Sequence, residues 1–285
     1  MSSSIISDIR NALKKMKSDK DTDRVVNDLI SNHLLHYTCQ FFEKDQTAGM
    51  KPFASGVLAI LGDSYYILTA SHVTDYLHDD QQLYLRIQKG YVSVVGDLRD
   101  TDIEESGGID LAYIRLDEKI VPDLLKAYQF LPLSKFRRHL KLLDAAQYCI
   151  IGFPVKNQKK VDGKLLTGAS VYVVQPSHIK VYKHYGFNEE SSIIMEFKGK
   201  GADLKTGELK KIKSDFYGLS GCGLWLIILE HDGKTYTSDF RLIGIMTEFR
   251  KDKFFCLIGN RIEIILHDLK ENGLINYNEK KLTSF

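Results

Sequence analysis

The segment FYGLSGCGLWLIILE, residues 216–230, joins a glycine-rich turn to an apolar run with the length of a β-strand. From about His33 onward the chain repeats short runs of this kind, rich in Tyr, Val, Ile and Phe and separated by polar or glycine-bearing turns. Examples are ASGVLAI, SYYILTA, QLYLRIQ, LAYIRL, QYCIIGF, ASVYVVQ, SIIMEF and FRLIGIMTEF. Many short strands at such spacing indicate a β-barrel or sandwich, not alternating β and α units.

The runs fall into two groups, before and after a loop-like stretch near residues 116–141, and both ends of the chain have helical periodicity. At the N-terminus Ile5, Ile9 and Leu13 recur at helical spacing, and GNRIEIILHDLKEN (259–272) does the same near the C-terminus. We therefore predict a mainly β fold of two β-barrels with an N-terminal helical appendage and a C-terminal helix. The predicted units are the appendage at 1–31, the first barrel at 32–125, and the second barrel with the C-terminal helix at 126–285.

The composition is typical of a folded soluble protein: of 285 residues, 44% are apolar and 27% are charged. A net charge of +2 is too small to indicate a nucleic-acid or membrane partner. No stretch has the length of a membrane-spanning helix, and the first residues lack the apolar block of a secretion signal. We accordingly expect a cytoplasmic protein with reduced thiols at Cys39, Cys149, Cys222 and Cys256.

The turn at 216–222 contains Ser220, and a serine is a poor nucleophile unless a base takes its proton and donors bind the resulting oxyanion. A candidate base is His72, which directly follows an apolar strand in YYILTASHVTDYL. A candidate acid is Asp110 in GGIDLAYIRLDE, where a buried carboxylate could accept the imidazole N–H. The order along the chain places base and acid in the first group of strands and the serine in the second. We therefore expect an active site in the cleft between the barrels.

These segments resemble the conserved blocks of the chymotrypsin/trypsin-like serine proteases. Among the branches of that family, they are most similar to the bacterial cytosolic one. TASHV (69–73) resembles the family's T-A-[AS]-H block, IDLAYIRL (109–116) its aspartate block, and GLSGCGLW (218–225) its G-[DNS]-S-G block. YCIIGFP (148–154) resembles a G-[YF]-P segment of the bacterial branch. The similar blocks follow the family's order from about Phe53 to the C-terminal helix.

The resemblance implies a Ser-His-Asp triad of Ser220, His72 and Asp110, with an oxyanion hole made by the backbone N–H groups of Gly218 and Ser220. It implies that Ser214, Thr247, Glu248 and Phe249 bind substrate. It also implies a serine endopeptidase that needs no cofactor or metal, acts on protein substrates and belongs to a bacterial sensing or antiviral defence system.

Two departures from the family pattern predict a restrained enzyme. Leu219 stands where secreted, zymogen-derived members carry an aspartate that pairs with a newly cut N-terminus, so activation by N-terminal cleavage is not expected. Phe249 would crowd the primary specificity pocket and disfavour large side chains there. We therefore expect a gated protease that cuts few protein substrates, with an activating partner protein as one means of gating.

Three other interpretations compete with a serine protease. An α/β-hydrolase elbow would need glycine at Cys222, a helix after the serine, and a later histidine, for which only His231 and His267 remain. His33, His36 and Cys39 are spaced three apart, which places alternate side chains on opposite faces of a strand and disfavours a zinc site. The alternative that stays open is a catalytically silent protease fold acting as a binding or regulatory module.

Overall fold

The structure is a computed structural model. It describes residues 20–45, 49–78, 81–137, 147–157, 159–161, 164–166, 168–196, 200–202, 209–211, 216–231 and 236–277. The first part of the predicted N-terminal appendage, with Ile5, Ile9 and Leu13, lies outside these residues.

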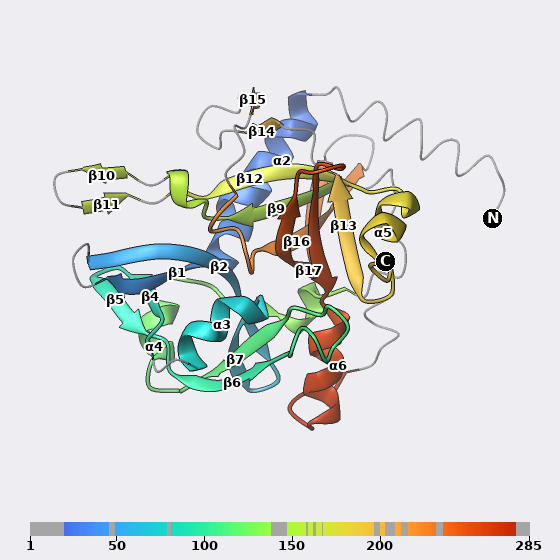
Figure 1. Ribbon diagram of the computed structural model, residues 1–285. Helices are drawn as coiled ribbons and strands as arrows, with labels where there is room; N and C mark the ends of the chain where they lie inside the picture. Colours follow the sequence, from blue (N-terminus) through green and yellow to red (C-terminus); the bar gives the residue numbers. More distant parts are fainter. Residues whose placement is uncertain are drawn as a thin grey trace.

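The first sheet is built mainly from antiparallel strands, and its central strands are buried along most of their length (Figure 1). Its strands are β1 (Thr38–Asp45), β2 (Gly49–Leu61), β3 (Ser64–Thr69), β4 (Tyr84–Ile87), β5 (Gly90–Ser93), β6 (Gly96–Asp100) and β7 (Ala112–Leu116). Their order is β5-β4-β1-β2-β3-β7-β6, and β8 (Leu131–Pro132) pairs in parallel with β2. The edge strands β5 and β6 do not pair with each other, so this part of the described chain is a half-barrel.

The second sheet closes on itself. Its strands are β9 (Gln147–Gly152), β12 (Ser170–Pro176), β13 (Ser192–Glu196), β14 (Lys200–Ala202), β15 (Leu209–Lys211), β16 (Gly223–His231), β17 (Tyr236–Arg250) and β18 (Cys256–Arg261). The order is β13-β18-β17-β16-β9-β12-β14-β15, and an added β13–β12 pairing closes the barrel. The short hairpin of β10 (Lys159–Val161) and β11 (Lys164–Leu166) projects to one side (Figure 1).

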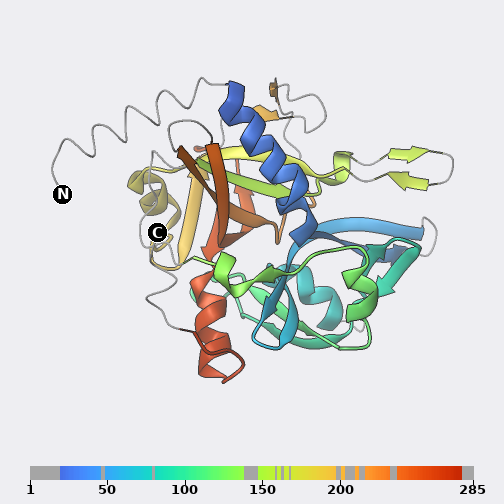
Figure 2. The same ribbon diagram turned by 180° about the vertical axis from the view of Figure 1, so that it is seen from behind.

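Helices are few and lie around the two sheets. They are α2 (Lys20–Asn32), α3 (Ser71–His78), α4 (Val121–Leu125), α5 (Ile179–Tyr185) and α6 (Glu263–Glu271), with 3-10 turns η1 (Leu34–Tyr37), η2 (Leu133–Lys135) and η3 (Val155–Asn157). Seen from behind, α2 crosses the second barrel and runs toward the first sheet (Figure 2). α6 lies beside the first sheet, where Tyr113 of β7 donates a hydrogen bond to Asp268 at 2.6 Å.

One hydrophobic core joins α2 and α6 to both sheets. It includes Val57 of the first sheet, Trp225 and Leu242 of the second, and Leu29 and Ile30 of α2, all buried. Burial of the last turn of α2 shows that the predicted appendage packs into the core where it meets the barrels.

The arrangement confirms the predicted fold class: a mainly β chain with two barrel-like units and helices toward both ends. The differences are that the first unit is open and that part of the expected loop at 116–141 forms α4, η2 and β8. The helix α5 carries no motif that the sequence analysis had singled out. The domain boundaries remain predictions.

The four cysteines are free thiols and all are buried, as expected for reduced residues used in packing. Within the part of the chain that the structure describes, no helix has the length and apolarity needed to cross a membrane.

Candidate active site

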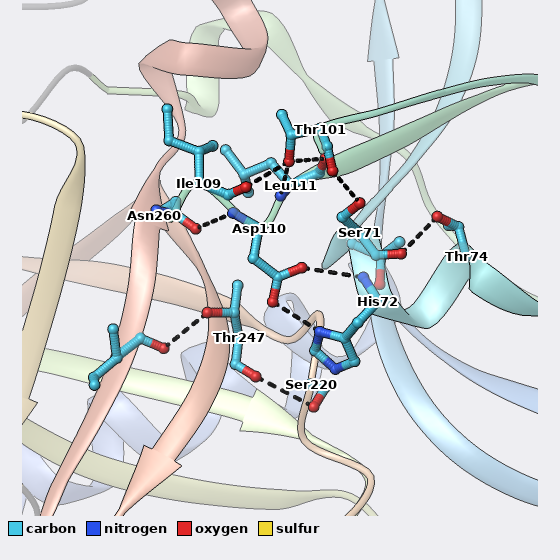
Figure 3. Close-up of polar contacts among 12 residues, drawn as sticks. Ser71, His72, Thr74, Thr101, Ile109, Asp110, Leu111, Ser220, Thr247 and Asn260 are labelled. Atoms are coloured by element: carbon cyan, nitrogen blue, oxygen red, sulfur yellow. Dashed lines mark hydrogen bonds and ion pairs between the residues drawn. The ribbon is translucent and has the colours of Figure 1, made fainter. Parts of the chain in front are cut away.

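His72 lies where the first sheet meets the cleft, in the first turn of α3 just after β3. Its ring Nδ1 is 2.7 Å from Oδ2 of Asp110, and its backbone N–H donates to Oδ1 of the same residue at 3.1 Å (Figure 3). Since a carboxylate can only accept, the imidazole proton is assigned to Nδ1, which leaves Nε2 as the acceptor. The carboxylate thus fixes both the position and the tautomer of the ring.

Asp110 is itself held by residues of both sheets. Its backbone N–H donates at 3.0 Å to Oδ1 of Asn260, a buried residue of β18. On the other side Thr101 bonds to both chain neighbours of Asp110: its hydroxyl donates to the Ile109 carbonyl at 2.7 Å and accepts from the Leu111 N–H at 3.0 Å. The sequence analysis missed Asn260 and Thr101, because nothing in their local sequence marks a polar residue that bonds to a distant backbone.

The pKa of His72 is raised above its ordinary value of 6.5. Partial burial of the ring is the largest influence and lowers the pKa, but the hydrogen bond and charge of Asp110 raise it. The negative charges of Asp75 and Glu248 raise it further. The site therefore favours the imidazolium, the form that a general base takes on when it accepts a proton.

Ser220 lies in the turn at 216–222, whose carbonyls are tied to other segments. The Tyr217 carbonyl accepts from the Val155 N–H at 2.9 Å, and the Gly218 carbonyl accepts from the Ser55 hydroxyl at 2.7 Å. The Ser220 carbonyl accepts from the Ser55 N–H at 2.9 Å. The orientation of the turn is thus set by contacts with β2 and with the segment after β9.

The N–H groups of the turn divide into bonded and unbonded ones. Those of Leu219, Gly221 and Cys222 donate to backbone carbonyls at 2.8 to 3.0 Å. Those of Gly218 and Ser220 have no acceptor among the residues that the structure describes. The turn thus presents, beside the Ser220 hydroxyl, two N–H groups that can donate to a negatively charged oxygen.

The turn requires glycine at two positions. Gly218 has φ of +96° and Gly221 has φ of +84°, in the region that L side chains rarely adopt. A Cβ at Gly218 would lie 2.6 Å from the Phe153 carbonyl oxygen, and one at Gly221 would lie 2.1 Å from the Ser55 carbonyl oxygen. The glycines are therefore needed for the backbone to approach these segments.

The Ser220 hydroxyl makes no hydrogen bond to His72. Its Oγ donates to the Thr247 carbonyl at 3.4 Å, a long hydrogen bond. In Figure 3 the serine lies on the side of the imidazole ring away from Asp110. The structure thus brings the three predicted catalytic residues together, with the base and acid paired and the serine turned toward a backbone carbonyl.

A small cavity of about 30 Å³ opens beside Ser220. Its lining residues are Phe216, Leu219, Ser220, Met246, Thr247, Glu248, Phe249 and Leu257. This is the space open to the centres of water-sized spheres, about two to three times what one water molecule needs, so the cavity takes small groups and not a large side chain. Three of the predicted substrate-binding residues thus line one cavity, while Ser214 lies outside the described residues.

Aromatic side chains account for the small volume. The rings of Phe216 and Phe249 are 4.3 Å apart between centroids, and Phe255 packs edge-on against Phe249 at 5.0 Å. Phe249 thus packs on Phe216 and lines the cavity beside Ser220, while its role in a specificity pocket stays a prediction. A larger cavity of 720 Å³, lined by residues such as Asp63, Asp97 and Glu118, contains none of the predicted site residues.

Other reactive groups near the turn are unsuited to nucleophilic chemistry or metal binding. Burial is the main reason that the pKa of the Cys222 thiol is raised, so this cysteine stays a neutral packing residue. Among the described residues, no three His, Cys, Asp or Glu side chains gather where they could hold a metal ion.

Comparison with known proteins gives structural similarity only. No protein-family model and no curated protein matches the chain. It is similar to the solved structure of the tobacco vein mottling virus protease, with 13% identity and a TM-score of 0.44 over 87% of this chain and 90% of that one. It is also similar to the scabies mite inactivated protease paralogue S-D1, with 12% identity and a TM-score of 0.49 over 86% and 96% of the two chains.

Proposed function

We propose that this protein is a serine endopeptidase whose nucleophile, base and acid are Ser220, His72 and Asp110. The observation that carries the proposal is the meeting of two preformed parts in one cleft. The first sheet supplies an imidazole oriented by a carboxylate at 2.7 Å, and the second barrel supplies a serine turn with two unbonded N–H groups. Acyl transfer requires these parts: a base, an orienting acid and oxyanion donors.

In the proposed reaction Nε2 of His72 accepts the proton of the Ser220 hydroxyl while Oγ attacks the scissile carbonyl carbon. The N–H groups of Gly218 and Ser220 bind the oxyanion, and Asp110 stabilises the imidazolium. The imidazolium then donates its proton to the leaving amine as the peptide bond breaks, and an acyl-enzyme remains. Water, deprotonated by the same histidine, attacks the ester to release the second product and restore the serine.

This sequence requires one small rearrangement from the present geometry. The Ser220 hydroxyl must rotate from the Thr247 carbonyl toward Nε2 of His72, and its present bond is long at 3.4 Å. Rotation about a single side-chain bond is a low-barrier change, and hydrogen bonds of catalytic groups often tighten only once substrate is bound.

Cleavage of peptides tests this function. The purified protein and its Ser220→Ala variant would be incubated with a library of unmodified peptides, and new termini would be identified by mass spectrometry. We expect products with the wild type and none with the variant. Equal product formation by both would contradict the proposal, because the activity would then not depend on Ser220.

A second function, that of a silent protease-fold binding module, is favoured by two observations. The Ser220 hydroxyl faces a backbone carbonyl, and the adjacent cavity holds only about 30 Å³. In such a module the cleft would bind a partner protein without cutting it. Binding of peptides with no new termini, under conditions that label no serine, would support this function over the first.

The small cavity also supports a restrained enzyme. We propose that the protease acts in the cytoplasm on few protein substrates and that an activating partner protein enlarges or completes the groove. The bacterial sensing or antiviral defence role remains a proposal that rests on the sequence resemblance. Rapid digestion of casein by the isolated protein, with Ser220→Ala inert, would contradict the restraint.

A further inference from the structure

Ser55 occupies an unusual place in the first sheet. It lies on β2, is fully buried, and its side chain faces the second barrel and not a strand neighbour. Its hydroxyl donates to the Gly218 carbonyl at 2.7 Å and accepts from the Phe153 N–H at 3.0 Å. These partners are 163 and 98 residues away in the sequence. One buried hydroxyl thus joins β2, the segment after β9 and the serine turn.

The backbone of Ser55 adds two further bonds. Its N–H donates to the Ser220 carbonyl at 2.9 Å, and its carbonyl accepts from the Thr69 hydroxyl at 2.9 Å. Thr69 is the last residue of β3, just before the turn that leads to His72. Ser55 therefore connects the serine turn to the strand that precedes the candidate base.

The direction of the unbonded N–H groups follows from the peptide planes. In a trans peptide the carbonyl and the N–H point to opposite sides, so fixing one fixes the other. The Gly218 N–H lies in the plane whose carbonyl, that of Tyr217, accepts from Val155, and the Ser220 N–H lies in the plane whose carbonyl, that of Leu219, accepts from the Cys222 N–H. Ser55 holds the two planes that alternate with these, one after Gly218 and one after Ser220. Gly218, with φ of +96° and no side chain, is the joint at which this turn can most readily rotate.

We propose that Ser55 is a positioning residue: its hydroxyl fixes the peptide plane after Gly218, which lies between the planes that carry the N–H groups of Gly218 and Ser220, and so holds the serine turn in the conformation that leaves both groups unbonded. The contacts that order the turn then all come from this chain. The proposed restraint of the enzyme lies in the crowded groove and not in the turn. The importance of Ser55 for catalysis rests on the proposed protease function, but its ordering of the turn does not.

Removing the hydroxyl has a local consequence. Ser55→Ala leaves the Gly218 carbonyl and the Phe153 N–H without their bond to the Ser55 hydroxyl. The plane after Gly218 is then held only through the Leu219 N–H, which donates to the Phe216 carbonyl at 3.0 Å, so the turn loosens between the two unbonded donors. Ser55→Cys keeps a side chain of similar size with a weaker donor, so its effect should be intermediate. It also serves as the second variant if Ser55→Ala does not yield folded protein.

The matched control is Thr38→Val. Thr38 lies on the neighbouring strand β1, is buried, and its hydroxyl donates to the Leu34 carbonyl at 3.2 Å. The variant therefore loses the same kind of buried hydrogen bond at a place that does not touch the serine turn.

Two readouts test the proposal. The rate at which a fluorophosphonate labels Ser220, together with kcat and KM on a cleaved peptide, reports on the oxyanion donors. Amide hydrogen exchange at Leu219, Gly221 and Cys222 reports on the order of the turn without reference to activity. For Ser55→Ala we expect labelling and kcat to fall by about tenfold or more, with KM nearly unchanged and faster exchange at all three amides. Thr38→Val should leave all of these at wild-type values.

Wild-type labelling rates and unchanged exchange in Ser55→Ala would overturn the proposal. Equal slowing by Thr38→Val would also overturn it, because the effect would then be one of general stability. If even the wild type is not labelled, the protease function fails, while hydrogen exchange still decides whether Ser55 orders the turn.

Discussion

The two halves of the cleft differ in how far they are assembled. On the first sheet the side chains of His72 and Asp110 are already paired at 2.7 Å, and the His72 backbone N–H donates to the same carboxylate at 3.1 Å. On the second barrel the backbone around Ser220 is ordered by several hydrogen bonds, but its hydroxyl donates to the Thr247 carbonyl at 3.4 Å. If the protein is the proposed protease, order in the turn together with a cavity of only about 30 Å³ places the restraint in the groove and not in the serine turn.

The largest effect should come from Ser220 on the second barrel, whose hydroxyl is not yet bonded to the base. Ser220→Ala removes the nucleophile, and we expect kcat to fall by about 10⁶-fold, to background. The free energy of unfolding should change by no more than about 0.5 kcal/mol, because the hydroxyl makes a single long bond. Peptide cleavage and thermal unfolding measure the two quantities. Substantial remaining cleavage would show that Ser220 is not the nucleophile.

The next largest effect should come from the His72–Asp110 pair on the first sheet. Asp110→Asn removes the charge that orients His72, and we expect kcat to fall by about 10⁴-fold. The base must be neutral to act, and its raised pKa means that activity is lost as the pH falls through a value above 6.5. Without the carboxylate the pKa of His72 falls, so this loss should move to lower pH.

The control for this change is Asp75→Asn. Asp75 is exposed and raises the pKa of His72 through its charge, after the larger contribution of Asp110. We expect a smaller shift of the pH profile in the same direction and nearly full activity. A larger shift than that of Asp110→Asn would contradict the assignment of the orienting acid.

The residues in these predictions differ in how far the sequence alone could identify them. His72, Asp110 and Ser220 could be named because each lies in a short block whose neighbours are characteristic. Ser55 and Asn260 could not, since each acts through a hydrogen bond to a backbone atom more than 90 residues away.

The same limit applies to the fold. Alternating apolar runs predicted the strands and their two groups, because the period of side-chain exposure is local. Whether the first sheet would close, and that Leu29 and Ile30 of α2 would join the core of both sheets, depends on packing between distant segments. Local periodicity contains no information on such contacts.

If the groove is the point of restraint, enlarging it should raise activity. Phe249→Ala removes a ring that packs at 4.3 Å on Phe216 and lines the cavity beside Ser220. We expect kcat/KM on peptides with a large side chain before the scissile bond to rise by about tenfold or more. The free energy of unfolding should fall by about 1–3 kcal/mol, since the ring is partly buried.

Phe255→Ala is the control for this prediction, because Phe255 packs against Phe249 at 5.0 Å but does not line the cavity. It should lose stability with little gain in activity. If neither variant gains activity on any peptide, crowding is not what restrains the enzyme.

The smallest effect is expected from the contact that joins the two halves through the backbone. Asn260→Ala removes the acceptor for the Asp110 N–H at 3.0 Å, and one such bond contributes about 1 kcal/mol. We expect kcat to fall by about fivefold, with the pH profile nearly unchanged because the carboxylate stays. A loss as large as that of Asp110→Asn would mean that the first half is not preassembled by His72 and Asp110 alone.

The central claim, that His72 activates Ser220 as a nucleophile, is tested most directly by the pH dependence of fluorophosphonate labelling with the modified residue identified by mass spectrometry. We predict a single adduct on Ser220, absent from Ser220→Ala, whose rate of formation rises with pH through a midpoint above 6.5. The absence of an adduct, an adduct on another residue, or a rate that does not change between about pH 5 and 9 would contradict the claim.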